Sequence, residues 1–323
     1  MKHQKILLRV APRVGSGARA ILFGLGILTT YRKGSLVEAV GKTPTIRARW
    51  LGKELQELRK ASGVEVQAVA EFLDKQRGVV SRFERGEFPV SIDELPGLLD
   101  LYRLNDLKKR ASLLKLAQEV TQRGWADGHG VASGLANLIW LEENAHRMLI
   151  LSTTVVHGLF QTSGYARALF DVKAEDENPD QVRRWLDTRQ VRGELIQGPA
   201  GPAVRVLILE TVLDHQVGGI AVMADQIRHL ISTAELPQIE LRVLPRGAWR
   251  HIGMGLDTGH TLFEMRNDWP TVVATDSPAG TVYAESPDID WVAEDFQTLW
   301  DADALDEAQS TNLLKAKLKD VTK

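Results

Sequence analysis

The chain has 323 residues, of which 44% are hydrophobic and 25% are charged, and it contains no cysteine. This length and apolar content suffice for more than one buried core, so we expect two domains. Without cysteine the chain forms no disulfide and binds no metal through thiolates. This composition fits a reducing, cytoplasmic compartment.

The net charge of −2 conceals an uneven distribution along the chain. Residues 1–43 hold eight Lys or Arg against one acidic residue, for a net charge of +7. Residues 44–110 hold 13 basic and 11 acidic residues, which leaves −11 for residues 111–323. An acidic C-terminal part is a poor surface for nucleic acid. DNA binding by this chain therefore depends on how the few surplus cations of residues 44–110 are placed.

Residues 1–43 form a basic extension that mimics a signal peptide, with cations ahead of the apolar run Ile21–Leu28. This run is too short for a transmembrane helix, which needs about 20 apolar residues, so we expect no membrane segment. Two interpretations stay open: the extension is a disordered tail, or the natural start lies near Val37 or Val40.

Residues 44–123 predict an all-helical domain that contains two short helices joined by a tight turn. Apolar residues recur at helical spacing over 64–73, and a polar turn follows. The next segment, Arg77–Glu84, places Val80 and Phe83 on one face and cations off that face. Two such helices are typical of a helix-turn-helix whose second helix enters the major groove of DNA.

Short local signals mark the boundaries around this pair. We expect Gly86 to cap the second helix, and Ser91–Glu94 has the pattern of a capping box that opens the next helix. The glycine-rich stretch 124–134 predicts a linker to a second domain.

The motifs of this region resemble the Cro/CI-like (xenobiotic-response-element) helix-turn-helix family. They are Leu-x-x-Leu-Arg from Leu55, Val69-Ala70, and Val80-Ser81-Arg82-Phe83-Glu84-x-Gly86. The resemblance implies sequence-specific binding of double-stranded DNA. Arginine pairs with guanine through two hydrogen bonds, so Arg77 and Arg82 are the expected base contacts. The candidate DNA-binding residues are Gln67, Gln76, Arg77, Gly78, Val79, Ser81 and Arg82.

Residues 135–323 alternate helix and strand patterns, which predicts an α/β or α+β domain. The chain is thus expected to be multi-domain, with an all-α helix-turn-helix bundle followed by this second domain. The predicted helices are 135–148, 179–196, 220–233, 288–300 and 305–321, and the predicted strands are 204–209, 239–244, 261–265, 271–274 and 281–284.

The second domain resembles the C-terminal domain, of uncharacterised function, in actinobacterial antitoxin-like transcriptional regulators. The motifs include Trp140-Leu141-Glu142, His157-Gly158-Leu159-Phe160-Gln161-Thr162-x-x-Tyr165-Ala166-Arg167 and Arg189-Gln190. The resemblance implies a domain that senses a ligand or a partner protein. For five polar residues we expect helix capping and surface packing, and the alternative is that they line one pocket or interface: Gln161, Tyr165, Arg167, Arg189 and Gln190.

No catalytic pattern is present in the sequence. The acids and histidines Glu210, Asp214, His215 and His229 lack the compact spacing of a metal site, so we expect no enzyme, no metal and no cofactor. The sequence therefore predicts a cytoplasmic, DNA-binding transcriptional regulator that forms a homodimer, as two-fold operators require. The alternative is an antitoxin-like factor that holds a small partner protein and binds DNA only for autoregulation.

Overall fold

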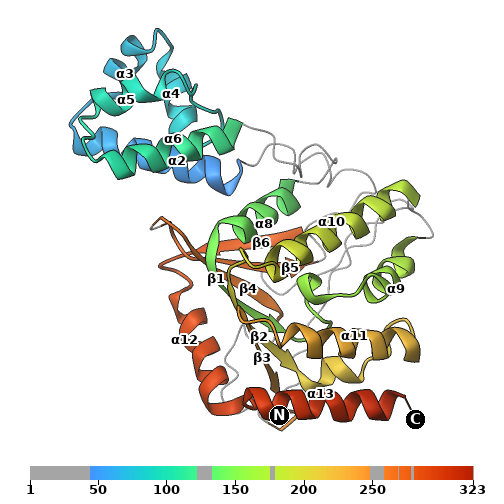
Figure 1. Ribbon diagram of the computed structural model, residues 1–323. Helices are drawn as coiled ribbons and strands as arrows, with labels where there is room; N and C mark the ends of the chain where they lie inside the picture. Colours follow the sequence, from blue (N-terminus) through green and yellow to red (C-terminus); the bar gives the residue numbers. More distant parts are fainter. Residues whose placement is uncertain are drawn as a thin grey trace, which may run out of the picture. The chain divides into compact units, whose positions relative to one another are not determined.

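The computed structural model describes residues 44–121, 133–174, 179–247, 258–267, 269–277 and 280–322 (Figure 1). The predicted basic extension 1–43 lies outside the described residues, as does most of the predicted linker 124–134. A helical region, 46–121, is followed by a region with a mixed six-stranded sheet and helices. This is the fold class that the sequence predicts.

The helical region contains the expected short helices in the expected order. Its elements are α2 (Ile46–Ala61), α3 (Val66–Phe72), α4 (Arg77–Glu84), α5 (Leu95–Leu101) and α6 (Leu107–Thr121). The predicted helix Arg77–Glu84 is confirmed residue for residue as α4. Its apolar side chains Val80 and Phe83 are buried in the core, as their spacing predicts.

The start of α5 corrects the predicted capping box. Glu94 is the N-cap residue of α5 and makes no side-chain cap hydrogen bond. Its carboxylate pairs instead with the Nζ atom of Lys75. The backbone N–H groups of Glu94 and Leu95 both donate to the carbonyl oxygen of Ser91, at 3.1 Å each, so a turn occupies the position where the capping box predicts the first helical turn.

The C-terminal region is built on one sheet with the strand order β3-β2-β1-β4-β5-β6. Its strands are β1 (Ala145–Ser152), β2 (Ala203–Leu209), β3 (Ile239–Leu244), β4 (His260–Met265), β5 (Val272–Ser277) and β6 (Gly280–Glu285). Strands β1, β2 and β3 are parallel, whereas β4, β5 and β6 join by antiparallel pairing. Strand β1 therefore lies where the parallel and antiparallel halves of the sheet meet.

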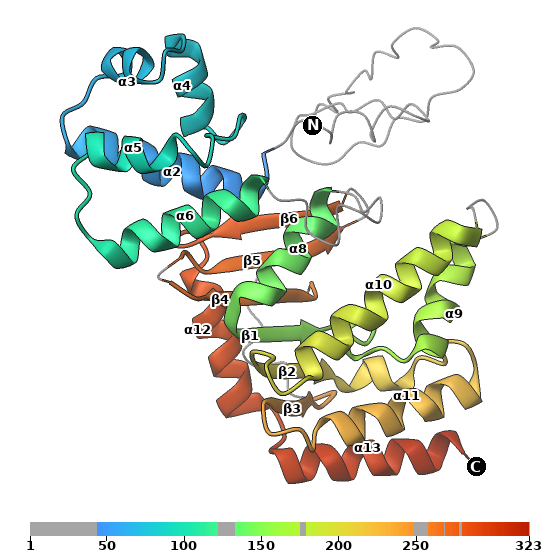
Figure 2. The same ribbon diagram turned by 45° about the horizontal axis from the view of Figure 1, so that its top comes forward.

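Helices cover both faces of this sheet. They are α8 (Ser133–Asn144), α9 (Ser163–Ala174), α10 (Pro179–Gln197), α11 (Ile220–Thr233), α12 (Asp290–Thr298) and α13 (Glu307–Val321). Figures 1 and 2 show α8 and α10 lying across one face, whereas α12 lies on the other face, against β1. Helix α13 packs against α11 and the edge strand β3.

The predicted helix 135–148 is wrong at its C-terminal end. Helix α8 ends at Asn144, and the chain continues directly into β1, which begins at Ala145. Residues Met148–Ser152 are all buried because β1 pairs with β2 on one side and β4 on the other. A strand buried in this way shows a continuous apolar run, which resembles a buried helix in the sequence.

The sheet topology brings distant residues to one edge. The C-terminal end of β1 reaches Ser152, and the antiparallel partner β4 begins beside it at His260. In the next hairpin, Asp276 near the end of β5 pairs with Thr281 near the start of β6. The space beyond the ends of strands, where the strand order changes direction, is a common place for ligands in α/β sheets.

Candidate functional site

The N-terminal end of α4 is the exposed part of the helix-turn-helix. Gln76, Arg77 and Gly78 are exposed to solvent, whereas Val80 and Phe83 retain only 1% and 4% of their surface. A Cβ atom placed on Gly78 would meet nothing within 4 Å. This end of α4 is therefore free to approach another molecule without any rearrangement of the core.

Two glycines hold α4 close to α2. A Cβ atom on Gly52 of α2 would lie 2.4 Å from the carbonyl oxygen of Phe83, so only glycine allows this approach. Gly86 follows the C-cap residue Arg85 with φ of +70°, and a Cβ atom there would lie 2.7 Å from the backbone of Ala48. The predicted stop at Gly86 is thus one residue beyond the cap, in the left-handed conformation that glycine adopts readily.

A buried ion pair fixes the same contact. The Arg59 Nε atom lies 2.5 Å from Glu84 Oε1, and Nη2 lies 3.2 Å from Oε2. Arg59 also donates to the carbonyl oxygen of Val64, at 3.0 Å. Its hydrogen bond to Glu84 raises the pKa of Arg59. In the sequence both residues stand in the helix-turn-helix motif without an assigned role, and the structure shows that they join α2 to the end of α4.

The two candidate base-contacting arginines have different surroundings. Arg82 lies over the ring of Phe88, at 5.3 Å from the centroid, and its Nε atom is 3.9 Å from a Glu87 carboxylate oxygen. Arg77 makes no ion pair or hydrogen bond within the described part of the chain. Of the two, Arg77 is the cation that DNA can engage without breaking an existing contact.

The other candidate contacts are placed as follows. Gln67 is exposed on α3 and donates to Glu71 at 2.7 Å, while Val79 and Ser81 are half-buried on α4. The structure thus puts most of the seven predicted DNA-binding residues on or next to one exposed helix end. Their roles in DNA binding stay predictions.

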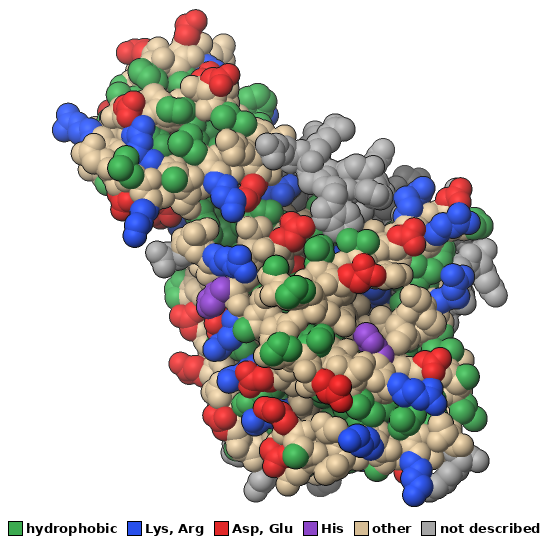
Figure 3. Space-filling view, viewed as in Figure 1, with side chains coloured by type: hydrophobic (Ala, Val, Ile, Leu, Met, Phe, Trp, Pro, Cys, Tyr) green, Lys and Arg blue, Asp and Glu red, His purple; other side chains and the backbone are tan. Residues whose placement is uncertain are grey.

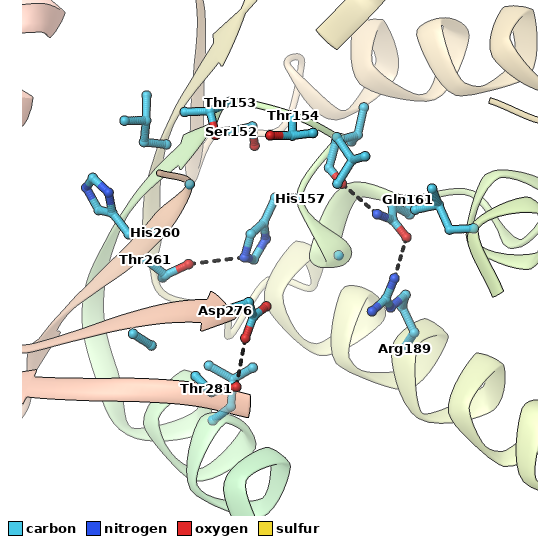
Figure 4. A pocket seen from close by; sticks show the side chains of 18 of the residues that line it. Ser152, Thr153, Thr154, His157, Gln161, Arg189, His260, Thr261, Asp276 and Thr281 are labelled. Atoms are coloured by element: carbon cyan, nitrogen blue, oxygen red, sulfur yellow. Dashed lines mark hydrogen bonds between the residues drawn. The ribbon is translucent and has the colours of Figure 1, made fainter. Parts of the chain in front are cut away.

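A cavity of about 620 Å³ lies at the strand-end edge of the C-terminal sheet. Its lining includes Ser152 from β1, His260 from β4 and Asp276 from β5, together with residues of the segments that connect β1 to β2. Figure 4 shows Ser152, His157, Asp276, Gln161 and Arg189 around this space. We call it the strand-end cavity.

His157 is a neutral histidine in the wall of this cavity. The backbone N–H of Leu159 donates to its Nδ1 atom at 3.4 Å, and Nε2 lies 3.1 Å from the hydroxyl of Thr261. This pattern places the proton on Nε2, which then donates to Thr261. Burial, reinforced by the charges of Arg192 and Arg189, lowers the pKa of His157 to about 3.

Two arginines of α10 line the strand-end cavity, and they differ in how their charge is balanced. Arg192 forms two hydrogen bonds with the buried carboxylate of Glu142, at 2.8 and 2.6 Å. Arg189 donates instead to the neutral Gln161 at 2.6 Å and lies 4.8 Å from the centroid of the Phe170 ring. Burial, followed by the charge of Arg192, lowers the pKa of Arg189 to about 10.

Two further residues of the lining each have a polar atom without a hydrogen-bond partner among the residues that the structure describes. These atoms are Ser152 Oγ and His260 Nε2, and their residues retain only 3% and 5% of their surface. The other ring nitrogen of His260, Nδ1, lies 3.0 Å from the carbonyl oxygen of Thr258, so Nδ1 carries the proton and Nε2 is an acceptor. The strand register places Ser152 on the same sheet face as Thr261, which contacts His157, and His260 on the opposite face. Buried polar atoms are almost always hydrogen-bonded, so the Ser152 hydroxyl at this cavity needs an explanation.

The structure brings together two of the five candidate residues in this domain. Gln161 and Arg189 meet in the cavity wall, as just described. Tyr165 is fully buried beside it, and its hydroxyl accepts from the N–H of Val156 at 3.3 Å. Arg167 and Gln190 are exposed and do not line the cavity.

Sequence reasoning missed the remaining cavity residues. Ser152, His260 and Asp276 come from three strands and stand in no local motif, so only the strand pairing reveals that they lie together. His157 and Arg192 gave a weak signal, since His157 stands in a motif that carries the family resemblance and Arg192 follows another by two residues.

The acidic residues considered for a metal site have another role. The Nζ atom of Lys317 lies 2.8 Å from a carboxylate oxygen of each of Glu210 and Asp214. These contacts tie α13 to the turn after β2. Among the residues that the structure describes, no group of three or more His, Cys, Asp or Glu side chains is arranged to hold a metal ion.

The described helices are all too short or too polar to cross a membrane. Figure 3 shows basic and acidic side chains interspersed over the visible face of the C-terminal region, with no broad cationic surface in that view. Together with the charge of −11 on residues 111–323, this favours the helical region as the place for a polyanion.

Comparison with known families gives two matches. Residues 135–316 match a domain of unknown function (DUF5753), and residues 50–113 match a helix-turn-helix domain. No curated protein and no solved structure matches the chain. The helix-turn-helix match supports DNA binding and is consistent with a transcriptional regulator.

Proposed function

We propose that this chain, which belongs to the DUF5753 family, is a sequence-specific, DNA-binding transcriptional regulator. Helix α4 enters the major groove, and the C-terminal domain senses a ligand or a partner protein. One observation carries the proposal: Gln76, Arg77 and Gly78 are exposed at the start of α4, while Val80 and Phe83 anchor the helix in the core. A recognition helix needs this combination of a fixed buried face and a free polar end.

The proposal gives each side chain a task. Arg77 and Arg82 read guanine through their paired N–H donors, and the polar side chains of Gln67, Gln76 and Ser81 hold the phosphate backbone. Because Arg82 already lies against Phe88 and Glu87, we assign the stronger base contact to Arg77.

The finer features of the proposal follow from the family resemblance and from symmetry. We place the helical domain in the Cro/CI-like group and the whole chain among antitoxin-like regulators of the cytoplasm. We also propose a homodimer, because a single small domain makes few DNA contacts and a two-fold protein matches a two-fold operator. The proposal assigns no catalytic step to the chain.

The deciding experiment is a gel-shift titration with the DNA upstream of the gene and a scrambled duplex of equal length, at two salt concentrations. The proposal expects tighter binding to the upstream DNA, and binding to both duplexes that weakens as salt rises. Equal affinity for the two duplexes would reject sequence-specific regulation. Equal affinity together with a small co-purifying protein would favour the antitoxin-like factor that holds a partner.

An arginine variant tests the assigned helix. Arg77→Ala should weaken binding to the specific site by about 1–3 kcal/mol and leave scrambled DNA nearly unaffected. The matched control is Arg228→Ala, which removes an exposed arginine paired with Asp225 on α11. An equal loss of affinity for both duplexes would show that Arg77 contacts phosphate. No loss of affinity for either duplex would show that Arg77 does not contact DNA, against the assignment of α4 as the recognition helix.

A further inference from the structure

We propose that the strand-end cavity binds a small organic acid, whose carboxylate pairs with Arg189 and whose hydrogen-bond donor reaches Asp276. This inference deepens the proposed ligand-sensing role of the C-terminal domain and rests on that role. It names the chemical class of the ligand, and four features of the cavity support it.

The first feature is the size and composition of the cavity. Its volume of about 620 Å³ falls within the range of about 300–1,000 Å³ that is usual for small-molecule sites. Leu135, Leu138 and Phe170 supply apolar wall, while the strand ends supply polar groups. A few polar groups set into a partly apolar wall are what fix the orientation of a small ligand.

The second feature is the unbalanced charge of Arg189. Arg192 is buried and its charge is balanced by the contacting carboxylate of Glu142, whereas the half-buried Arg189 feels the charges of Asp276 and Glu142 only at a distance. Within the described residues Arg189 has no ion pair, only the neutral Gln161 and the ring of Phe170. Gln161 is itself held by the carbonyl oxygen of Val156, at 2.6 Å. The guanidinium is therefore oriented in advance, with donors left for an anion.

The third feature is the carboxylate of Asp276, which shares the sheet face of Thr261 and Ala274. This exposed carboxylate uses one oxygen to accept from Thr281 at 2.7 Å, and its other oxygen calls for a donor on the ligand, either a hydroxyl or an ammonium group. The cavity thus presents a cation from α10 and an acceptor from β5.

The fourth feature is the unpartnered hydroxyl of Ser152, at the end of β1. A serine hydroxyl both donates and accepts, so it suits either end of such a ligand. His157, which stays neutral, contributes no charge and leaves Arg189 as the group that selects an anion.

The test uses three six-carbon probes and the full chain without DNA. The first is 6-aminohexanoate, which has a carboxylate and an ammonium group. The second is hexanoate, which has only the carboxylate, and the third is hexylamine, which has only the ammonium group. Binding is followed by calorimetry and by the imidazole ¹⁵N signals of His157, which lies in the cavity wall. We expect both acids to bind saturably with shifts at these signals, 6-aminohexanoate more tightly, and hexylamine to bind at least tenfold more weakly than either.

Variants tie the binding to named residues. Arg189→Gln should weaken binding of both acids at least tenfold, Arg189→Lys should retain most of it, and the control Arg228→Gln should change nothing. Ser152→Ala removes a hydroxyl that has no hydrogen-bond partner within the described residues, so the variant should fold normally. Its affinity for 6-aminohexanoate should nevertheless fall several-fold.

Several outcomes would overturn the inference. They are an absence of saturable binding by either acid at millimolar concentration, hexylamine binding as tight as that of the acids, or full affinity in Arg189→Gln. Because no DNA is present, acid binding by a chain that shows no preference for its upstream DNA would leave the inference standing and reject the regulator. A chain that prefers its upstream DNA but binds neither acid would reject the inference and leave the proposed regulator standing.

Discussion

The ion pair between Arg59 and Glu84 gives the sharpest stability prediction. The side chains of Arg59 and Glu84 retain only 10% and 6% of their exposure, and two hydrogen bonds join them. Glu84→Ala would leave the guanidinium with the carbonyl oxygen of Val64 and, within the described residues, no carboxylate. Removing one partner of a buried pair costs about 3–5 kcal/mol, and the remaining exposure of Arg59 argues for the lower end, about 3 kcal/mol.

A double variant separates the pair from the packing around it. Replacing both partners with apolar residues, Arg59→Met with Glu84→Leu, leaves no unpaired charge, so its stability should lie within about 1 kcal/mol of the parent. The free energies come from urea denaturation of the full chain followed by circular dichroism, with DNA anisotropy as a second probe of the helical domain.

The control is Glu87→Ala, which removes an exposed pair with Arg85 and should leave the urea midpoint unchanged. The reasoning fails if Glu84→Ala costs no more than Glu87→Ala. It fails equally if the double variant loses at least as much as Glu84→Ala alone, because then the two charges are not coupled.

Three further predictions concern other parts of the structure. Gly52→Ala brings a Cβ atom to 2.4 Å from the carbonyl oxygen of Phe83, and this overpacking should cost about 1–3 kcal/mol in urea denaturation; an unchanged midpoint would mean that α2 and α4 are not so close. The pKa of His157 is about 3 in the folded chain and 6.5 when unfolded, so between these pH values the unfolded state binds a proton that the folded state does not. The free energy of unfolding therefore falls as the pH falls, by up to about 1.4 kcal/mol per pH unit. His157→Gln should reduce this slope, and NMR should show a neutral His157 ring at pH 5; a protonated ring there would contradict the assignment. Lys317→Ala should lower the melting temperature measured by calorimetry, because α13 loses its ties to Glu210 and Asp214, whereas the exposed Lys319→Ala should not; equal effects would show that the ties contribute nothing.

The sequence was sufficient to predict an element wherever the element has one buried face and one more exposed face. Helix α11 was predicted with its observed bounds because Met223, Ile227 and Leu230 recur at helical spacing on its buried face. Strand β3 was predicted for the same reason, since its residues alternate between buried and half-buried along most of its length. Local periodicity is enough for such elements because each has one face in the core.

The sequence failed where distant pairing decides the structure. Ala145–Met148 continue the apolar pattern of α8, and only the pairing of β1 with β2 and β4 turns them into a strand. The strand-end cavity depends on the same pairing. Gln161 and Arg189 were two of five candidates for a pocket, with capping and surface packing as the other interpretation, whereas Ser152 and His260 lie in strands about a hundred residues apart. No local pattern marks residues that meet only across a sheet.

Gly78 bears on how the operator choice of the proposed regulator can change over evolution. The glycine stands at the exposed start of α4, and a side chain placed there meets nothing in the described structure within 4 Å. Gly78 is the second residue of α4, so a replacement by a better helix former does not oppose the helix. In the proposed complex, a single codon change there adds a new group at the DNA-facing end of α4 while the core stays as it is. We therefore expect operator preference to be adjustable at this position with little change in stability.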